Sequence, residues 1–562
     1  MNGPAHDDAA DSAIDAPEEA AENQAPKAVF EVSSAFGVAP HQVSFDASGS
    51  SDTDGVIASY AWDFGDGGEG VGKEAQHSYA AAGCYVARLT VTDEGGLSGI
   101  AEKTLVVTVA APAGSPVVEV GEKPRDMAVI PRDTKTKAGV VRVAGTVKSP
   151  GYHAVVAEWI EGGAVVSSQT APLCGTAAEL PFELELTLPS DLVSRDLRVS
   201  VVEGTTSTQI AEVKDLVAGD ILLVQGQSNA VSAQYSGDAN VNQSPFVRSF
   251  GTRIEDGAAT VADAAWHRAE GNAAEGKGAV GQWPLRMARA LVDARKVPIG
   301  ILNGARGGKP ISYFQRDDAN PANAATNYGR LLLRARAAGI DGRVSAILFY
   351  QGESDGANAQ AHHDGWAALY ADWLQDYPSV RRTYVTQIRL GCGSPTVQTL
   401  DVQRRLADEF AGVSVMSTTG LDGHDGCHFA YAEGYEELGG RYASLLMRDL
   451  FGGTASPDIE APNPKRAYFS NAGRTELTVE MRDAESTLSW GSGSQAHFTV
   501  EGSAVTVTSG TAAGANLVLT LSGDGAGATS LRYAGHSGAG PWVTNAKGVG
   551  LLAFEGLSIE SK

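Results

Sequence analysis

The chain has 562 residues, a net charge of −24 and 67 glycines. At roughly 100–200 residues per domain, this length predicts about three to five domains. An acidic surface repels phosphate backbones and anionic lipids, which excludes nucleic acid as the main partner. No apolar run reaches the roughly 18–20 residues that a membrane-spanning helix needs. The sequence therefore predicts several folded domains without membrane insertion, and it leaves the oligomeric state open.

The N-terminal residues 1–27 contain seven acidic residues, one lysine and many alanines. Such a segment cannot bury enough apolar surface to fold. We expect it to be a disordered acidic linker.

Residues 28–111 alternate apolar and polar positions between clusters of turn residues, which predicts a small β-sandwich. The expected strands are 28–32, 42–45, 58–64, 85–91 and 103–109. At the centre stands Trp-Asp-Phe-Gly-Asp-Gly at positions 62–67. This motif resembles the signature of the PKD domain, an immunoglobulin-like extracellular module that is often attached to bacterial polysaccharide-active enzymes.

Three carboxylates precede this motif in a loop rich in Ser, Gly and Asp, namely Asp46, Asp52 and Asp54. Oxygen ligands of this kind suit a structural Ca²⁺ ion. The same residues also form turns through their side chains. No Glu stands at a spacing that would close a calcium loop, so the turn role is favoured.

The next two regions differ in their hydrophobic pattern. Residues 116–218 again predict a β-sandwich, with strands at 140–146, 153–159, 182–187 and 197–202.

From 219 to 452, near-continuous apolar strands alternate with helical stretches, which predicts a parallel sheet covered on both faces. The expected strands are 221–224, 298–302, 346–350, 383–388 and 413–416, and the expected helices 281–295, 327–338, 363–376, 398–410 and 432–449.

The C-terminal residues 462–562 return to alternation, with expected strands at 476–481, 497–500, 504–508 and 517–521. They predict a last β domain.

Polar segments that contain possible catalytic side chains follow the strands of the α/β region. Ligand sites of open parallel sheets lie at this end of the strands. Ester hydrolysis needs a nucleophile, a base, a group that orients the base, and donors for the oxyanion. Ser228 can act as nucleophile, His428 as base and Asp425 as the orienting group. The backbone of Gly307 or Gly308 and the side chain of Gln351 can supply donors.

These segments resemble the SGNH hydrolase superfamily, and most closely its sialate O-acetylesterase-type branch and the acetylxylan esterases of carbohydrate esterase family six. The resemblance rests on Gly-Gln-Ser-Asn at 226–229, Gly-Gly at 307–308, Gln-Gly-Glu at 351–353 and Asp-Gly-Cys-His at 425–428. Ala305-Arg306 before the double glycine, and Lys309 after it, depart from the family pattern.

The resemblance implies an α/β/α three-layer, flavodoxin-like domain that removes O-acetyl groups from carbohydrates without a metal or other cofactor. It implies the catalytic triad Ser228, His428 and Asp425. The oxyanion donors would be the Ser228 backbone, a glycine of the pair 307–308 and Gln351, with Gln227, Asn229 and Glu353 in support.

Two alternatives stay open. Gly-Glu-Ser-Asp-Gly at 352–356 matches the nucleophile elbow of α/β-hydrolases and would make Ser354 the nucleophile. Glu353 and Asp355 would then oppose a developing oxyanion, and the expected helix begins too far downstream. The second alternative is a glycan-binding protein that has lost activity, although its complete Ser/His/Asp set favours an enzyme.

Three side chains after the strand at 298–302 are candidates for substrate contact. Tyr313 and Phe314 could form a platform for a sugar ring. Arg306 could contact an acidic sugar, or it could simply be solvated.

The four cysteines show no spacing typical of a zinc site. Cys392 follows a strand, and Cys427 lies in the loop of the base, so both belong at the carboxyl edge of the sheet. We therefore expect a Cys392–Cys427 disulfide. Cys84 and Cys174 lie in separate β modules, and we expect both to be unpaired. We also expect a secreted, periplasmic or cell-surface protein whose signal peptide has been removed.

Overall fold

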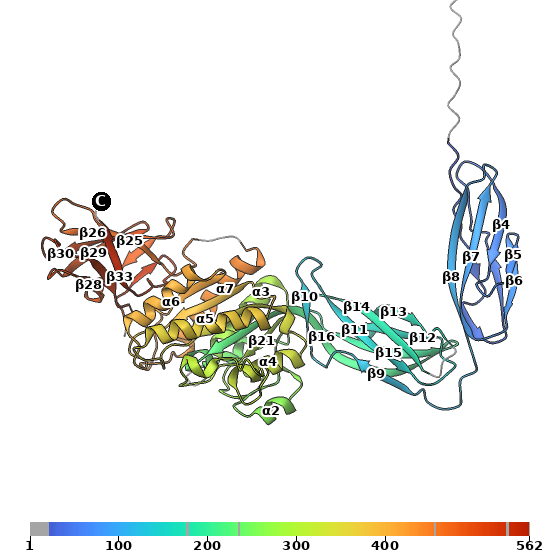
Figure 1. Ribbon diagram of the computed structural model, residues 1–562, viewed down its shortest axis with the longest axis horizontal. Coiled ribbons are helices and arrows are strands. Elements are labelled where there is room, and N and C mark those ends of the chain that lie inside the picture. Colours follow the sequence, from blue (N-terminus) through green and yellow to red (C-terminus); the bar gives the residue numbers. More distant parts are fainter. Residues whose placement is uncertain (1–21, 176–178, 234–236, 454–456, 536–538, 561–562) are drawn as a thin grey trace, which may run out of the picture.

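The computed structural model describes residues 22–175, 179–233, 237–453, 457–535 and 539–560. Four domains follow one another along an elongated molecule, with the first and the C-terminal domain at opposite ends (Figure 1). Most of the expected linker at 1–27 lies outside the described residues. Its last residues are attached to the first domain, because Asn23 Nδ2 donates to Asp93 and Lys27 pairs with Ser51.

The first domain is a β-sandwich, as its alternating pattern predicted. One sheet has the order β1-β3-β6 and the other β2-β8-β7-β4-β5. Trp62 and Phe64 of the central motif are buried between them. The strands are β1 (Glu31–Val32), β2 (Phe36–Val38), β3 (His41–Asp46), β4 (Ile57–Asp63), β5 (Glu69–Val71), β6 (Glu74–Tyr79), β7 (Gly83–Asp93) and β8 (Ser98–Thr108).

The second domain is also built from β-strands. Strand β12 pairs with β13 and β15, while β11 pairs with β9, β10 and β14. The strands are β9 (Val118–Glu122), β10 (Val129–Asp133), β11 (Ala138–Val147), β12 (Ala154–Glu161), β13 (Ala164–Pro172), β14 (Leu180–Pro189), β15 (Arg195–Glu203) and β16 (Thr206–Gly226).

A disulfide joins the first two domains, so the prediction that Cys84 and Cys174 are unpaired is wrong. The two cysteines are bonded, with their Cα atoms 5.1 Å apart. At the same contact the rings of Phe36 and His153 stack with centroids 4.0 Å apart. The prediction failed because it treated the two β modules as separate bodies.

Strand β16 belongs to two domains at once. Its first part pairs antiparallel with β15 up to Leu216, and from Asp220 onward it pairs in parallel with strands of the third domain. The expected boundary at Gly219 therefore lies inside a strand. Buried Asp220 adds ion pairs to Arg132 and Arg295, at 2.9 and 2.6 Å, which tie the second domain to the third.

The third domain contains a parallel sheet of order β17-β21-β16-β22-β23-β24. Without the edge strand β17, the strands stand in the chain order 2-1-3-4-5, the flavodoxin-like order. The right-handed connections of such a sheet place helices on both faces. Accordingly α3 packs against α7, and α5 packs against α6.

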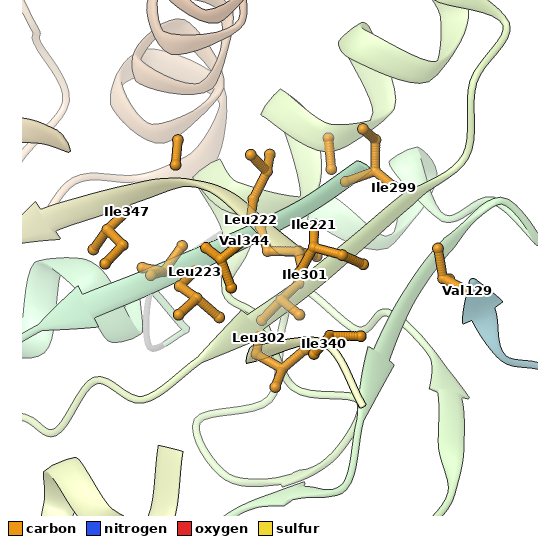
Figure 2. Close-up of a cluster of buried hydrophobic side chains, with 14 of the residues drawn as sticks. Val129, Ile221, Leu222, Leu223, Ile299, Ile301, Leu302, Ile340, Val344 and Ile347 are labelled. Atoms are coloured by element: carbon orange, nitrogen blue, oxygen red, sulfur yellow. The ribbon is translucent and has the colours of Figure 1, made fainter. Parts of the chain in front are cut away.

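Its strands are nearly all buried, as a sheet covered on both faces requires. Figure 2 shows Leu222 and Leu223 of β16 among side chains of β21 and β22, with Val129 of the second domain at the edge of the cluster. The elements are α1 (Ser228–Val231), η1 (Ala239–Asn242), β17 (Val247–Phe250), β18 (Thr252–Arg253), α2 (Gly257–Ala262), β19 (Trp266–Arg268), β20 (Gly276–Lys277), α3 (Gln282–Arg295), β21 (Ile299–Asn303), η2 (Ile311–Phe314), α4 (Asn327–Ala337), η3 (Asp341–Arg343), β22 (Val344–Tyr350), α5 (Ala359–Asp376), β23 (Arg382–Gln387), α6 (Val397–Glu409), β24 (Val413–Ser417), η4 (Tyr431–Tyr435) and α7 (Glu436–Phe451).

The C-terminal domain is a further β domain with its own hydrophobic core. Its larger sheet has the order β28-β31-β33-β25-β26-β30-β29, and β27 pairs with β32. The elements are β25 (Pro464–Phe469), β26 (Glu476–Met481), β27 (Leu488–Trp490), η5 (Ser494–His497), β28 (Phe498–Glu501), β29 (Val507–Ala513), β30 (Asn516–Leu521), β31 (Ser530–Tyr533), β32 (Val543–Asn545) and β33 (Phe554–Glu560).

Candidate active site

The candidate site lies where the strand order of the parallel sheet reverses, between β16 and β22. Ligands of open α/β sheets bind at this switch point, outside the carboxyl ends of the strands. The two strands approach closely there: a Cβ on Gly226 would lie 2.0 Å from the carbonyl oxygen of Tyr350. Only glycine fits at this position, which explains the residue two places before Ser228.

A cavity of about 710 Å³ opens at this edge. Ten of the residues singled out from the sequence line it: Gln227, Ser228, Arg306, Gly307, Gly308, Glu353, Ser354, Cys392, Cys427 and His428. Five others are not among its lining residues: Asn229, Tyr313, Phe314, Gln351 and Asp425. The structure thus brings the proposed nucleophile and base to one cavity.

Ser228 is the first residue of the short helix α1, and one residue, Gln227, separates it from the end of β16. The preceding side chain is fixed, because Gln227 Oε1 accepts a hydrogen bond of 3.1 Å from the Ser354 backbone N–H. Gly307 faces the serine, since a Cβ at this glycine would lie 3.6 Å from Ser228 Cβ. The Arg306 N–H donates to the Gly226 carbonyl and so holds the glycine loop against the end of β16.

His428 lies in the loop after β24, and Asp425 organises that loop. Asp425 Oδ1 accepts the backbone N–H groups of Cys427 and His428, both at 2.8 Å. Its other oxygen is 3.8 Å from His428 Nδ1. Burial lowers the pKa of His428, while Asp425 opposes this effect. The imidazole is therefore neutral at neutral pH, as a general base must be.

Three contacts fix the tip of this loop. The expected Cys392–Cys427 disulfide is present, with Cα atoms 4.4 Å apart. Asn229 Nδ2 donates to the Cys427 carbonyl at 3.2 Å. The guanidinium of buried Arg389, which no sequence motif marks, donates to the Gly426 carbonyl.

Glu353 is a buried carboxyl group on the wall of the cavity. Asn229 Nδ2 donates to its Oε1 at 2.8 Å, while its Oε2 has no hydrogen-bond partner among the described residues. Burial raises the pKa of Glu353 to about 7, against the opposing effect of the Asn229 hydrogen bond. Glu353 is therefore poised to take up or release a proton near neutral pH.

Gln351 is buried beside the cavity with its amide already engaged. Its Nε2 donates to Asp355 Oδ2 at 3.0 Å and to the Lys309 carbonyl at 3.3 Å. Asp355 also binds His362 Nδ1 at 2.7 Å. The oxyanion role of Gln351 stays a prediction, and the contacts visible here connect it to the loop framework.

The three side chains expected to contact the substrate, Tyr313, Phe314 and Arg306, differ in their burial and in their partners. Phe314 is fully buried in the hydrophobic core, so the platform role predicted for it is wrong. Its neighbour Tyr313 donates its hydroxyl to Glu255, and Arg306 forms ion pairs with Glu255 and Glu275. Arg306 is thus paired with carboxylates at the rim of the cavity.

Three other arginines line the cavity and were not found from the sequence: Arg253, Arg330 and Arg334. Each is at most 7% exposed, and none forms an ion pair with a carboxylate within the part of the chain that the structure describes. Arg253 donates to the carbonyls of Ala273 and Ala274, while its Nε has no partner there. No local motif marks these arginines, because they come from β18 and one face of the α4 region.

The candidate calcium ligands serve the turns of the first domain. Asp46 accepts the Ser48 N–H at 2.8 Å, and Asp52 accepts the Asp54 N–H at 3.5 Å. Across the described ranges, no three His, Cys, Asp or Glu side chains are grouped so as to hold a metal ion. None of the helices in these ranges is long and apolar enough to cross a membrane.

Two family models match the chain. Residues 23–109 match the PKD domain, and residues 218–448 match the family described as "Carbohydrate esterase, sialic acid-specific acetylesterase". The two families recognised from the sequence motifs are thereby confirmed, and residues 218–448 form an esterase-family domain.

Curated relatives match a short part of the chain. Collagenase ColA of Clostridium perfringens (strain 13 / Type A) is 41% identical over 86 residues, which are 15% of this chain and 8% of the collagenase. The microbial collagenase of Vibrio alginolyticus is 37% identical over 86 residues, 15% of this chain and 10% of that protein. The chain thus spans about a tenth or less of these relatives.

A solved structure matches much more of the chain. The crystal structure of a carbohydrate acetylesterase from Xanthomonas citri superposes with a TM-score of 0.53 at 18% identity. The match covers 78% of this chain and 99% of that chain. At this identity the match shows a shared fold.

Proposed function

We propose that this chain, with its esterase-family domain at 218–448, is a serine esterase that removes O-acetyl groups from carbohydrates. The observation that carries the proposal is that Ser228, His428 and the Gly307–Gly308 loop meet at one cavity at the switch point of the sheet. We assign the domain to the SGNH type of α/β/α fold, on the strand order and on the four ordered motifs.

In the proposed reaction, neutral His428 accepts the Ser228 Oγ proton as Oγ attacks the acetyl carbonyl carbon. The backbone N–H groups of Ser228 and Gly307 stabilise the oxyanion. Protonated His428 then donates to the departing sugar oxygen, which leaves an acetyl-serine. A water molecule, deprotonated by His428, releases acetate and restores the serine. Asp425 orients the imidazole, and the cycle uses no cofactor.

The cavity favours a sugar that carries a negative charge. Buried charges without a partner are costly, and Arg253, Arg330 and Arg334 have no carboxylate partner among the described residues. A carboxylate on the substrate would supply that partner. This fits the acidic sugar named in the description of the matched family better than a neutral polysaccharide.

The second candidate nucleophile is Ser354, because it lines the same cavity. Its surroundings favour it less. Helix α5 begins only at Ala359, so no helix starts directly after Ser354 as a nucleophile elbow requires. Ser228, in contrast, is the first residue of helix α1, which begins two residues after the end of β16.

We also propose that the protein works outside the cytoplasm. Two disulfides join described cysteines, and disulfides persist in oxidising compartments. The PKD match and the collagenase relatives are consistent with this placement.

Acetate release by the full chain tests the proposal. We expect turnover of an aryl acetate and of O-acetylated sialic acid, with lower turnover of acetylated xylan. Ser228→Ala should lower kcat by roughly 10⁴-fold or more, whereas Ser354→Ala should leave it within about twofold. If Ser354→Ala loses esterase activity and Ser228→Ala keeps it, Ser354 is the nucleophile. An inactive wild-type chain that still binds acetylated glycans would establish the glycan-binding alternative.

A further inference from the structure

A short segment of the C-terminal domain is built into the third domain. Val549, Leu552 and Ala553 are at most 2% exposed and belong to the hydrophobic cluster that includes the strands of the parallel sheet. Leu551, between them, belongs to the core of the C-terminal domain. The segment 548–553 therefore contributes to two cores at once.

Buried Gln387, the last residue of β23, binds this segment through two hydrogen bonds. Its Nε2 donates to the Ala553 carbonyl at 2.9 Å, and its Oε1 accepts the Ala553 N–H at 2.8 Å. Thr418 Oγ1 donates to the Gln387 carbonyl at 3.0 Å. Gln387 thus connects the segment to the residue that follows β24.

The segment also contacts the chain at the start of the loop that carries Asp425 and His428. The Gly550 N–H donates to the Thr419 carbonyl at 3.0 Å. Arg441 of α7 donates to the carbonyls of Gly548 and Gly420, at 3.0 and 3.3 Å. Its other terminal nitrogen donates to Ser417 and Thr419. One buried guanidinium therefore clamps the segment and residues 417–420 together.

We propose that the segment 548–553, with Gln387 and Arg441, positions the loop of the catalytic base, so that the C-terminal domain is part of the esterase unit. The proposal rests on the proposed function. The disulfide and Asn229 fix the loop at Cys427, while the segment 548–553 fixes its beginning. We expect a shift at Thr419 to move His428, which lies nine residues later in the same loop. A catalytic group misplaced by about 1 Å is costly for the rate.

Gly550→Ala tests this contact. A Cβ at Gly550 would lie 2.4 Å from both Cβ and Cγ2 of Thr419, and the glycine does not adopt a left-handed conformation. The substitution therefore acts through this contact and not through backbone strain. Gly523→Ala is the matched control in the same domain, because its Cβ would meet only Val505 Cγ1, at 4.0 Å.

We expect Gly550→Ala to lower kcat for an aryl acetate by about tenfold or more, with KM within about twofold of wild type. Gly523→Ala should match the wild type in both constants. The assay is run well below the melting temperature of each variant, measured by circular dichroism, so that all three proteins are folded. The acid limb of the pH–rate profile should also move in Gly550→Ala, because the surroundings of His428 change.

A Gly550→Ala variant that melts earlier but keeps the kcat and the pH profile of the control would overturn the inference. If Gly550→Ala does not fold, Gln387→Ala is judged by the same two criteria. A wild-type chain without esterase activity would refute the proposed function and, with it, this inference. An active wild-type chain whose Gly550→Ala variant keeps the kcat and the pH profile of the control would refute this inference alone.

Discussion

At the scale of single residues, Asn229, the residue after the nucleophile, connects Glu353 to the loop of the base. Asn229 donates both to Glu353 and to the Cys427 carbonyl, and its Oδ1 accepts the Tyr435 hydroxyl at 2.7 Å. The glutamate is buried on the cavity wall with a pKa of about 7. Its protonation state therefore bears on both stability and the electrostatics of the site.

Glu353→Gln should remove a pH dependence of stability. The folded pKa of about 7 exceeds the usual 4.5, so the unfolded chain releases this proton first and stability falls as pH rises from about 4.5 through 7. The variant should therefore gain on the order of 3 kcal/mol over wild type at pH 8 and little at pH 4. Urea unfolding at both pH values measures the difference, and parallel curves for the two proteins would contradict it.

Asp425→Asn should change the pH dependence of catalysis. Asp425 raises the pKa of His428 against the lowering effect of burial. Without this carboxylate, the acid limb of kcat/KM should move to lower pH while kcat falls by roughly 10²–10⁴-fold. If the acid limb of the pH profile of kcat/KM does not move, Asp425 is not a member of the triad. Asp422→Asn in the same loop is the control, because Asp422 Oδ1 accepts the N–H of the adjacent Gly423, whereas Asp425 Oδ1 accepts the N–H of His428.

At the scale of elements, the five helices and four of the five strands expected in the third domain were predictable to within a few residues, because their apolar periodicity is strong. The single strand β16 was not, since its first half alternates and its second half is continuously apolar. The short elements between β16 and α3, among them the edge strand β17, were not expected. Phe314 was misplaced because adjacency to Tyr313 does not tell which of the two side chains faces the core in the short helix η2. The unpaired arginines of the cavity were missed because only the tertiary fold gathers them.

The Cys392–Cys427 disulfide should support the loop of the base. The two cysteines are 35 residues apart in the sequence. For a loop of this length the chain-entropy model gives a stabilisation of the folded state of about 4 kcal/mol. Replacing both cysteines with serine should lower the melting temperature and reduce kcat more than it raises KM. The paired variant Cys84→Ser/Cys174→Ser should keep the wild-type kcat. Equal kcat values for both paired variants would show that the disulfide does not support catalysis.

At the scale of the whole molecule, three connections make the domains a continuous unit: the Cys84–Cys174 disulfide, strand β16 and the segment 548–553. Sequence patterns predicted the domains themselves, since each has its own hydrophobic periodicity. They did not predict these connections, because contacts between domains leave no periodic signal. The C-terminal contacts in particular depend on single polar groups such as Gln387 and Arg441.

Removing the first of these connections should free the first domain without affecting catalysis. In Cys84→Ser/Cys174→Ser, the stacking of Phe36 on His153 is the remaining ring contact at this junction among the described residues. We expect a broader distribution of interdomain distances in small-angle X-ray scattering and faster proteolysis near residues 109–117. A scattering profile identical to that of wild type would show that noncovalent contacts alone fix the first domain.

The identity of the nucleophile is the central claim, and covalent labelling tests it most directly. The full chain is incubated with a fluorophosphonate, which exchanges its fluoride for the oxygen of an activated serine, and the digest is analysed by mass spectrometry. We expect one phosphonylated peptide, containing Ser228, with loss of esterase activity in step with labelling. We also expect no label in the His428→Ala variant. A label on Ser354, or inactivation without a label on Ser228, would contradict the assignment of Ser228 as the nucleophile.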